Sequence, residues 1–313
     1  MSEVIQSLSI CCPSPSGKCI NHCATCTARQ HTNPYKNKYD GTHMECFEYW
    51  NDVIKRMKHA QDKGCTTVML TGSNEPQQNK RWLEGLYLAM KSLDKPFNNI
   101  EIQTTGAFLD RDYLEFLKWF GVTTVAVSTF SVFDDKINRA IEGNADKDLK
   151  IQELCDNIND LGMNVRICVN VTDYVLTESQ RRRLGTESVS GKTALMNECV
   201  NDLLNRCHEL HANQVTFRKM WANDGTPEAD WIHANESFAD DILSTIVNIV
   251  MIKGTLLNKL PYGASRYDYL GFSIVIDTDS MAKDETNAAI KYYIIRENGK
   301  MYSSWDSAAS IVF

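Results

Sequence analysis

The 313-residue sequence lacks any apolar run approaching the roughly 20 residues that a membrane-spanning helix needs. It also lacks a basic stretch followed by an apolar segment near its start, where the first charged residue is the acidic Glu3. No secretory signal peptide is therefore expected. Together these absences predict a protein with no membrane partner, and a cytoplasmic location.

An excess of basic residues is missing as well. The chain carries 33 Lys and Arg against 40 Asp and Glu, which gives a formal net charge of −7. A protein that binds nucleic acid mainly through phosphates needs the opposite sign. Nucleic acid is therefore not an expected partner, although a local basic pocket for a small anion is compatible with this charge.

A disulfide framework is the third feature we do not expect, because the 11 cysteines are odd in number and no export signal precedes them. Instead, three of them are clustered as Cys19, Cys23 and Cys26, with C-x3-C-x2-C spacing. Three thiolates can hold a [4Fe-4S] cluster and leave one iron with an open coordination position, which chemistry requires. This motif predicts a catalytic metal centre.

A structural zinc site is the alternative for the same cysteines. It would need a fourth ligand, for which His22, His31 and Cys46 are available. Structural zinc sites usually pair ligands from two separate places, however, and no second C-x2-C pair follows. No cysteine lies beyond Cys207, so an auxiliary cluster in the C-terminal part is not expected.

Short apolar runs of β type alternate with helix-type patterns, which is typical of βα units that build a parallel sheet. Six such units predict a partial (β/α)6 barrel over residues 1–233. The expected strands are 8–12, 66–71, 100–105, 123–129, 165–171 and 214–219. The expected helices lie near 44–63, 79–94, 110–120, 134–161 and 192–209.

The pattern changes after residue 233. A helix is expected at 236–253, followed by strands at 271–277, 290–297 and 300–304. Asn298-Gly299 is a strong hairpin signal, because both residues tolerate the positive φ of a tight turn. Residues 234–313 are therefore predicted to form a helix and a small antiparallel β extension.

Side chains alternate between the two faces of a strand, so residue parity shows what each face carries. In the fifth expected strand every second residue from Val165 to Val171 is valine or isoleucine, while Arg166, Cys168 and Asn170 share the other face. A barrel packed only with side chains would be lined by bulky branched residues. The polar face predicts a polar site inside.

The cysteine motif, in a loop after the first strand of a βα barrel, resembles that of the radical S-adenosylmethionine (radical SAM) superfamily. Gly72-Ser73-Asn74-Glu75-Pro76 resembles the family's Gly-rich Glu-Pro segment, which binds the amino group of SAM. The resemblance departs at Thr25, where many members have an aromatic residue, and at Ser73-Asn74, where Gly-Gly is commoner. It implies a cofactor site made of Gly72, Ser73, Glu75, Thr105, Ser128, Arg166 and Asn170.

The resemblance also implies the activity. The cluster and SAM would be the cofactors, an electron donor such as flavodoxin or ferredoxin would reduce the cluster, and SAM cleavage would give a 5′-deoxyadenosyl radical that takes hydrogen from a substrate. Arg218, on the polar face of the sixth strand, is our candidate catalytic-site residue for binding an anionic substrate. A small anionic metabolite or nucleotide is the first expectation, and a peptide or protein is the alternative. A non-catalytic zinc or iron–sulfur module is the alternative of another class.

Overall fold

The computed structural model describes residues 5–30, 46–144, 150–260, 264–277 and 290–313, apart from 306 and 308. The chain divides into two compact units. The first consists of Met1–Asn21, His31–Val125 and Asp284–Phe313, and the second of His22–Gln30 and Ala126–Lys283. Strand β4 (Thr124–Thr129) crosses from one unit to the other. The predicted division at residues 233/234 stays a prediction.

The first unit contains five strands in the order β11-β10-β1-β2-β3. Strand β1 is parallel to β2 and β10, β2 is parallel to β3, and only β11 runs antiparallel to its neighbour. The strands are β1 (Ile5–Cys11), β2 (Thr67–Thr71), β3 (Asn99–Thr104), β10 (Ile290–Ile295) and β11 (Met301–Tyr302).

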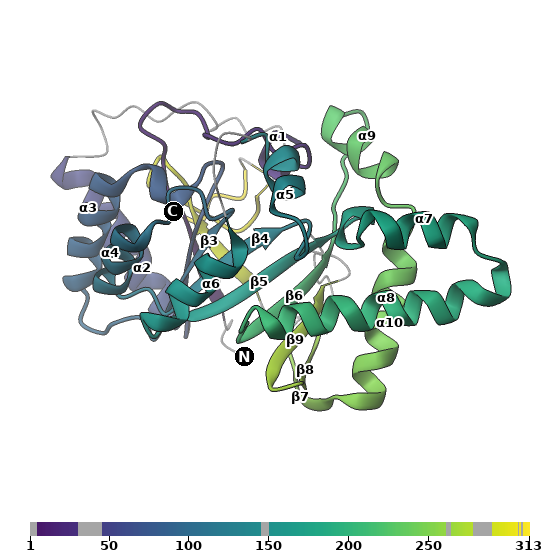
Figure 1. Ribbon diagram of the computed structural model, residues 1–313. Helices are drawn as coiled ribbons and strands as arrows, with labels where there is room; N and C mark the ends of the chain where they lie inside the picture. Colours follow the sequence, from purple (N-terminus) through teal and green to yellow (C-terminus); the bar gives the residue numbers. More distant parts are fainter. Residues whose placement is uncertain are drawn as a thin grey trace. The chain divides into compact units, whose positions relative to one another are not determined.

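Three helices pack against these strands, side by side in Figure 1. They are α2 (Phe47–Asp62), α3 (Lys80–Lys91) and α4 (Arg111–Phe120), with the short 3-10 helix η1 (Pro76–Gln78) before α3. The sequence sets their ends, since the side chain of Asp110 accepts a hydrogen bond from the Tyr113 N–H and Gly121 ends α4 with φ 104°. Their apolar stripes are fully buried, Leu86 and Leu117 among them.

The second unit carries the strand order β5-β6-β9-β8-β7. Strands β5, β6 and β9 are parallel, whereas β8 is antiparallel to both of its neighbours. The strands are β5 (Asn164–Val171), β6 (Gln214–Lys219), β7 (Thr255–Lys259), β8 (Ser265–Tyr269) and β9 (Phe272–Asp277).

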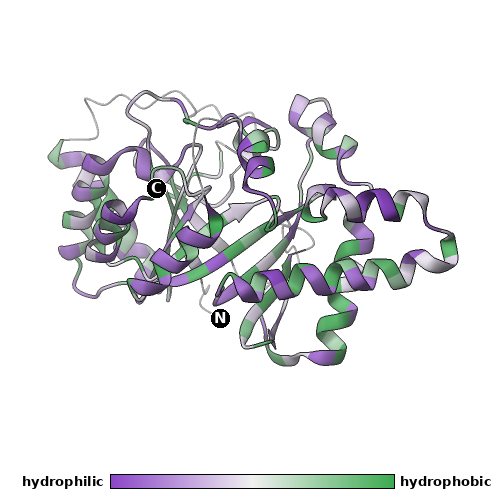
Figure 2. Ribbon diagram, viewed as in Figure 1, coloured by the Kyte–Doolittle hydropathy of each residue, from purple (hydrophilic) through white to green (hydrophobic). Residues whose placement is uncertain are grey.

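The helices of the second unit include two long ones, α8 (Val189–Glu209) and α10 (Ala239–Lys253), which pack on each other. Helix α8 buries a face of leucine, valine, methionine and cysteine, and α10 buries a face rich in isoleucine, leucine and valine. The other elements are α1 (Thr27–Gln30), α5 (Asp135–Glu142), α6 (Ile151–Asp160), η2 (Asp173–Val175), α7 (Glu178–Thr186) and α9 (Pro227–Ala234). Figure 2 shows α7 mostly in the purple of hydrophilic residues, so it is a solvated helix.

All six strands expected for the barrel are present, β6 with the predicted bounds. The helix expected at 134–161 is two helices, α5 and α6, because Gly143 ends the first with φ 64°. The hairpin at Asn298-Gly299 joins β10 to β11, with Gly299 at φ 76°.

The C-terminal part is more closely tied to the parallel strands than a separate antiparallel extension would be. Strand β9 adds in parallel to β6, and β10 adds in parallel to β1, while β7, β8 and β11 supply the antiparallel pairs. Parallel addition at an edge satisfies backbone groups that would otherwise lack partners. In the part of the chain described, no helix has the length and apolar character to cross a bilayer.

Candidate functional site

The three motif cysteines lie in the loop between β1 and α1, and all three are half-buried. Cys19 belongs to the first unit, and Cys23 and Cys26 belong to the second. None of them is in a disulfide. Across the described residues, no three His, Cys, Asp or Glu side chains are gathered as ligands of one metal ion. The assignment of these cysteines to a cluster therefore stays a prediction from the motif.

The first half of the loop is anchored to the segment after β2. The backbone N–H of Ile20 donates to Gln78 Oε1 at 3.0 Å. The Asn21 side chain, which is 3% exposed, donates to Glu75 Oε1 and to Thr105 Oγ1, each at 2.9 Å. Residues next to Cys19 are thus held by the very segment that resembles the family's SAM-binding segment.

Glu75 is buried, and its carboxylate is surrounded by donors of the chain. Besides Asn21, it accepts hydrogen bonds from Gln77 Nε2 at 2.8 Å, from Thr104 Oγ1 at 2.6 Å and from the Thr105 N–H. Burial raises the pKa of Glu75, and these hydrogen bonds partly offset that rise. The structure thus gives Glu75 an organising role, in addition to the expected contact with an ammonium group.

Gly72 and Ser73 lie where β1 and β2 end. Gly72 has φ 137°, and a Cβ there would be 3.2 Å from the Cys11 Cα, so a larger residue would push the two strand ends apart. Ser73 Oγ donates to Glu297 Oε1 at 3.0 Å. Glu297 is 4% exposed, and its Oε2 has no hydrogen-bond partner in the described part of the chain. Glu297 was not predictable from the local sequence, because it approaches Ser73 only through the parallel pairing of β10 with β1.

The second half of the cysteine loop runs against the end of α5. His22 N donates to the Glu142 carbonyl at 2.9 Å, and Ala24 N donates to the Ile141 carbonyl at 2.8 Å. A Cβ on Gly143 would lie 2.8 Å from the His22 carbonyl oxygen. The glycine that ends α5 therefore also makes room for the backbone beside Cys23.

Ser128 is half-buried in the last turn of β4, and the residues after it are fixed by one side chain of α5. Asn138 Oδ1 accepts hydrogen bonds from the N–H groups of Phe130 and Ser131, each at 2.8 Å, and from Thr129 Oγ1 at 3.0 Å. Through these hydrogen bonds, Asn138 joins the end of β4 to helix α5.

The predicted polar face of β5 and β6 is present. Val165, Ile167, Val169 and Val171 are all at most 1% exposed on the opposite face. Arg166 donates through Nε and Nη2 to Gln214 Oε1 at 2.8 and 2.6 Å, across the β5–β6 pair. Asn170 is 8% exposed and pairs in register with Arg218.

Arg218 faces an acidic residue of the neighbouring strand. Its Nε lies 3.8 Å from Asp277 Oδ2, and the two residues are paired in the β6–β9 register. That Nε is buried and has no hydrogen-bond partner among the residues that the structure describes. Asp277 thus partly neutralises the guanidinium charge, while the Nε–H group remains available as a donor.

Helix α7 carries three consecutive arginines, and each of them makes contacts within the chain. Arg181 donates to the Leu176 carbonyl and lies over the Tyr174 ring, Arg182 pairs with Glu178, and Arg183 pairs with Glu198. These contacts place the charge run of α7 on a solvated face, as the commoner behaviour of such runs predicts.

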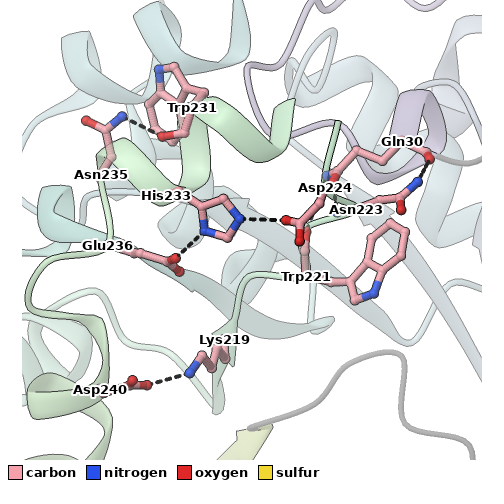
Figure 3. Close-up of polar contacts among 10 residues, drawn as sticks. All are labelled: Gln30, Lys219, Trp221, Asn223, Asp224, Trp231, His233, Asn235, Glu236 and Asp240. Atoms are coloured by element: carbon pink, nitrogen blue, oxygen red, sulfur yellow. Dashed lines mark hydrogen bonds and ion pairs between the residues drawn. The ribbon is translucent and has the colours of Figure 1, made fainter. Parts of the chain in front are cut away.

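The segment between β6 and α10 holds a polar cluster, shown in Figure 3. His233 lies between two carboxylates, with Nδ1 2.7 Å from Glu236 Oε1 and Nε2 3.0 Å from Asp224 Oδ1. The hydrogen bond to Glu236, and then that to Asp224, raises the pKa of His233. Nearer to β6, Lys219 Nζ pairs with Asp240 Oδ1 at 2.6 Å.

The donor chemistry of the motif fits an iron–sulfur cluster. The three thiols are half-buried, unlike Cys11 and Cys12, which are sealed in the core. Burial, and then the nearby Glu297 carboxylate, raise the pKa values of these two core thiols, which makes them poor ligands. In the second unit the Arg29 guanidinium is coupled electrostatically to Cys26 and Cys23.

The comparisons with known proteins agree with this chemistry. The family model of the radical SAM superfamily matches residues 14–186, which is more than half of the chain. The chain therefore belongs to the radical SAM superfamily. Its cofactors are S-adenosylmethionine and the family's [4Fe-4S] cluster.

Solved structures show the same fold. SuiB from Streptococcus suis, bound to S-adenosylmethionine, aligns over 97% of this chain and 61% of its own, with a TM-score of 0.56 and 16% identity. anSMEcpe with bound AdoMet and Cp18Cys peptide aligns over 96% of this chain and 75% of its own, with a TM-score of 0.52 and 12% identity.

This chain therefore spans about three fifths of the length of SuiB. The comparison with curated proteins gave no match. The expected fold class, a partial barrel with parallel strands and antiparallel strands toward the C-terminus, is confirmed.

Proposed function

We propose that Cys19, Cys23 and Cys26 hold the cluster, and that this enzyme takes a hydrogen atom from a small anionic metabolite or nucleotide. When bound, the cluster and SAM supply the one-electron cleavage that yields a 5′-deoxyadenosyl radical. The chain's own residues bind, orient and shield these groups. The SAM-contacting set proposed from the family resemblance is Gly72, Ser73, Glu75, Thr105, Ser128, Arg166 and Asn170.

The observation that carries the substrate proposal is the unused donor of Arg218. A buried guanidinium N–H without an acceptor is costly, so a substrate oxygen that fills this position would be bound favourably. Asp277, at 3.8 Å, holds the guanidinium near its strand without satisfying that N–H. Arg218 is thus proposed to grip a phosphate or carboxylate and to orient the substrate.

A peptide substrate is the second candidate. It is favoured by two solved structures that share the fold, SuiB bound to its precursor peptide SuiA and anSMEcpe with a Cp18Cys peptide. This support is at the level of the fold, because the identities are 14% and 12%. In either case an electron donor such as flavodoxin or ferredoxin is proposed. The cytoplasm is the proposed compartment, since none of the 11 cysteines forms a disulfide.

The first experiment tests the cluster and its ligands. The protein is purified anaerobically and reconstituted, iron, sulfide and zinc are measured, and reductant and SAM are added to detect 5′-deoxyadenosine. We expect about four irons per chain and product formation, which Cys19→Ala abolishes. Cys46→Ser is the matched control, because Cys46 is also half-buried but would bind only in a zinc site. Stoichiometric zinc that is lost in Cys46→Ser would overturn the proposal.

Of the two other zinc candidates, His31 lies outside the described residues, and His22 donates its backbone N–H to α5.

The second experiment addresses the substrate. Nucleoside monophosphates and short synthetic peptides are each tested for stimulation of 5′-deoxyadenosine formation. We expect the nucleotides to stimulate in the wild type and to lose this effect in Arg218→Ala, while uncoupled SAM cleavage is kept. Stimulation by peptides alone would favour the second candidate.

A further inference from the structure

Arg29 lies at the centre of the contacts that hold α1, the short helix directly after Cys26. Its Nε donates to Glu228 Oε1 at 2.5 Å, and its Nη2 donates to the Cys23 carbonyl oxygen. Its side chain is 32% exposed and that of Glu228 is 10% exposed. This ion pair is therefore partly shielded from solvent, and salt screens it less than it screens a surface pair.

The next residue makes a second link to the same part of the chain. Gln30 is 2% exposed, and its Oε1 accepts from the Asn223 N–H at 2.8 Å. In return, Asn223 Nδ2 donates to the Gln30 carbonyl at 2.8 Å (Figure 3). The part of the chain that follows β6 thus holds α1 through two neighbouring residues, Arg29 and Gln30.

The position of the Arg29 charge matters for a metal centre. The guanidinium is coupled electrostatically to the thiols of Cys26 and Cys23, and its contact with the Cys23 carbonyl keeps it beside them. A fixed positive charge near a cluster favours the more negative, reduced form, because the added electron is attracted to it. Glu228 opposes this effect in part, yet it also holds the guanidinium in place.

We propose that Arg29, held by Glu228, is a positioning residue that fixes the Cys23–Cys26 segment and raises the reduction potential of the cluster bound there. This inference rests on the proposed function, since it requires the motif cysteines to be the ligands. Arg29 acts on the cluster through the segment that carries Cys23 and Cys26.

The test is the midpoint potential of the reconstituted cluster, measured by anaerobic redox titration with electron paramagnetic resonance. Arg29→Gln removes the charge and keeps a side chain of similar length. We expect it to shift the one-electron equilibrium about tenfold toward the oxidised cluster, which corresponds to about 59 mV. Arg29→Lys keeps the charge, so its potential should stay close to that of the wild type even though one hydrogen bond is lost.

Arg182→Gln is the matched control for the change of charge, because Arg182 is also paired with a glutamate but lies on the solvated helix α7. Equal potentials in Arg29→Gln and Arg182→Gln, with intact four-iron clusters, would overturn the inference and leave the proposed function standing. A wild-type protein that binds no four-iron cluster would overturn the proposed function itself. If Arg29→Gln fails to fold, the midpoint potentials of Arg29→Lys and Glu228→Gln test the inference instead. A potential in Glu228→Gln above the wild-type value supports the charge effect, because an opposing negative charge has been removed, and an equal or lower potential contradicts it.

Discussion

Asn21, two residues after the first motif cysteine, donates a hydrogen bond to the buried carboxylate of Glu75 at 2.9 Å. The same amide group reaches Thr105 Oγ1, so three chain segments meet at one point of the first unit. Glu75 accepts further hydrogen bonds from Thr104 and Gln77. A residue expected only to meet a ligand thus also holds the loop that carries Cys19.

Glu75→Gln should destabilise the protein, and the effect should depend on pH. The variant replaces one acceptor oxygen with an N–H group among donors, at a cost of about 1–3 kcal/mol. Burial raises the pKa of Glu75 in the folded state. The stability linked to this shift is therefore fully present below the unfolded pKa of about 4.3 and is lost as pH rises through the folded pKa.

Urea unfolding of the metal-free protein under reducing conditions, from pH 4.5 to 8, checks this expectation. The difference between wild type and Glu75→Gln should be larger at the acidic end and smaller at the alkaline end. A pH-independent difference would show that burial of Glu75 is not coupled to proton binding.

Gly143→Ala should disturb the backbone beside Cys23. Gly143 has φ 64°, and the added Cβ would lie 2.8 Å from the His22 carbonyl oxygen. Gly225→Ala is the control, because Gly225 also has a positive φ, at 87°, but a Cβ there meets nothing within 4 Å. Both variants bear the left-handed backbone cost of about 1–2 kcal/mol.

Only Gly143→Ala should also lower the iron bound after reconstitution, to below half of the wild-type content. Iron analysis and urea unfolding measure the two effects separately. The same iron content in both glycine variants would mean that the close approach of Gly143 to His22 does not position the loop.

Local sequence patterns were sufficient to predict the six strands of the barrel and the polar face of β5. Strand β6 was predicted with its observed bounds, because its alternation is flanked by a clear helix and a polar segment. Strand β7 was missed because all of its residues are exposed, so it shows no alternation between apolar and polar. Helix α7 was missed for a related reason, since only Gln180 and Leu184 of it are buried.

The contacts that organise the candidate site are long-range, and no local pattern predicts them. Asn21 and Glu75 are 54 residues apart in sequence, and Arg29 and Glu228 are 199 apart. Glu297 reaches Ser73 only because β10 pairs with β1 in parallel, whereas the sequence indicated a separate antiparallel extension. Residue types were predictable at the strand ends, but their partners depended on the topology.

The cysteines should fall into two reactivity classes. Burial raises the pKa values of Cys155 and Cys207 to about 12, so about one thiol in ten thousand is ionised at pH 8. The half-buried motif cysteines should react with iodoacetamide in the metal-free protein and become protected after anaerobic reconstitution. Mass spectrometry of the alkylated peptides distinguishes these outcomes.

Labelling in urea is the control for the thiol experiment, because unfolding should make Cys155 and Cys207 reactive as well. Native labelling of these two cysteines at the rate of Cys19 would contradict their burial. Motif cysteines that stay reactive after iron and sulfide are incorporated would contradict their assignment as ligands.

His233 should titrate above the ordinary histidine range. Its hydrogen bond to Glu236, followed by that to Asp224, raises its pKa above the usual value of about 6.5. Stability that comes from these contacts is fully present below the unfolded pKa and is lost as pH rises through the folded pKa. Nuclear magnetic resonance of the imidazole signals between pH 5 and 9 measures the pKa directly.

Glu236→Gln should lower the pKa of His233 more than Asp224→Asn does, since Glu236 makes the shorter contact, at 2.7 Å against 3.0 Å. Because the ring is half-exposed, added salt should reduce the upward shift of the His233 pKa. A His233 pKa that neither variant changes would show that the two carboxylates do not stabilise the protonated ring.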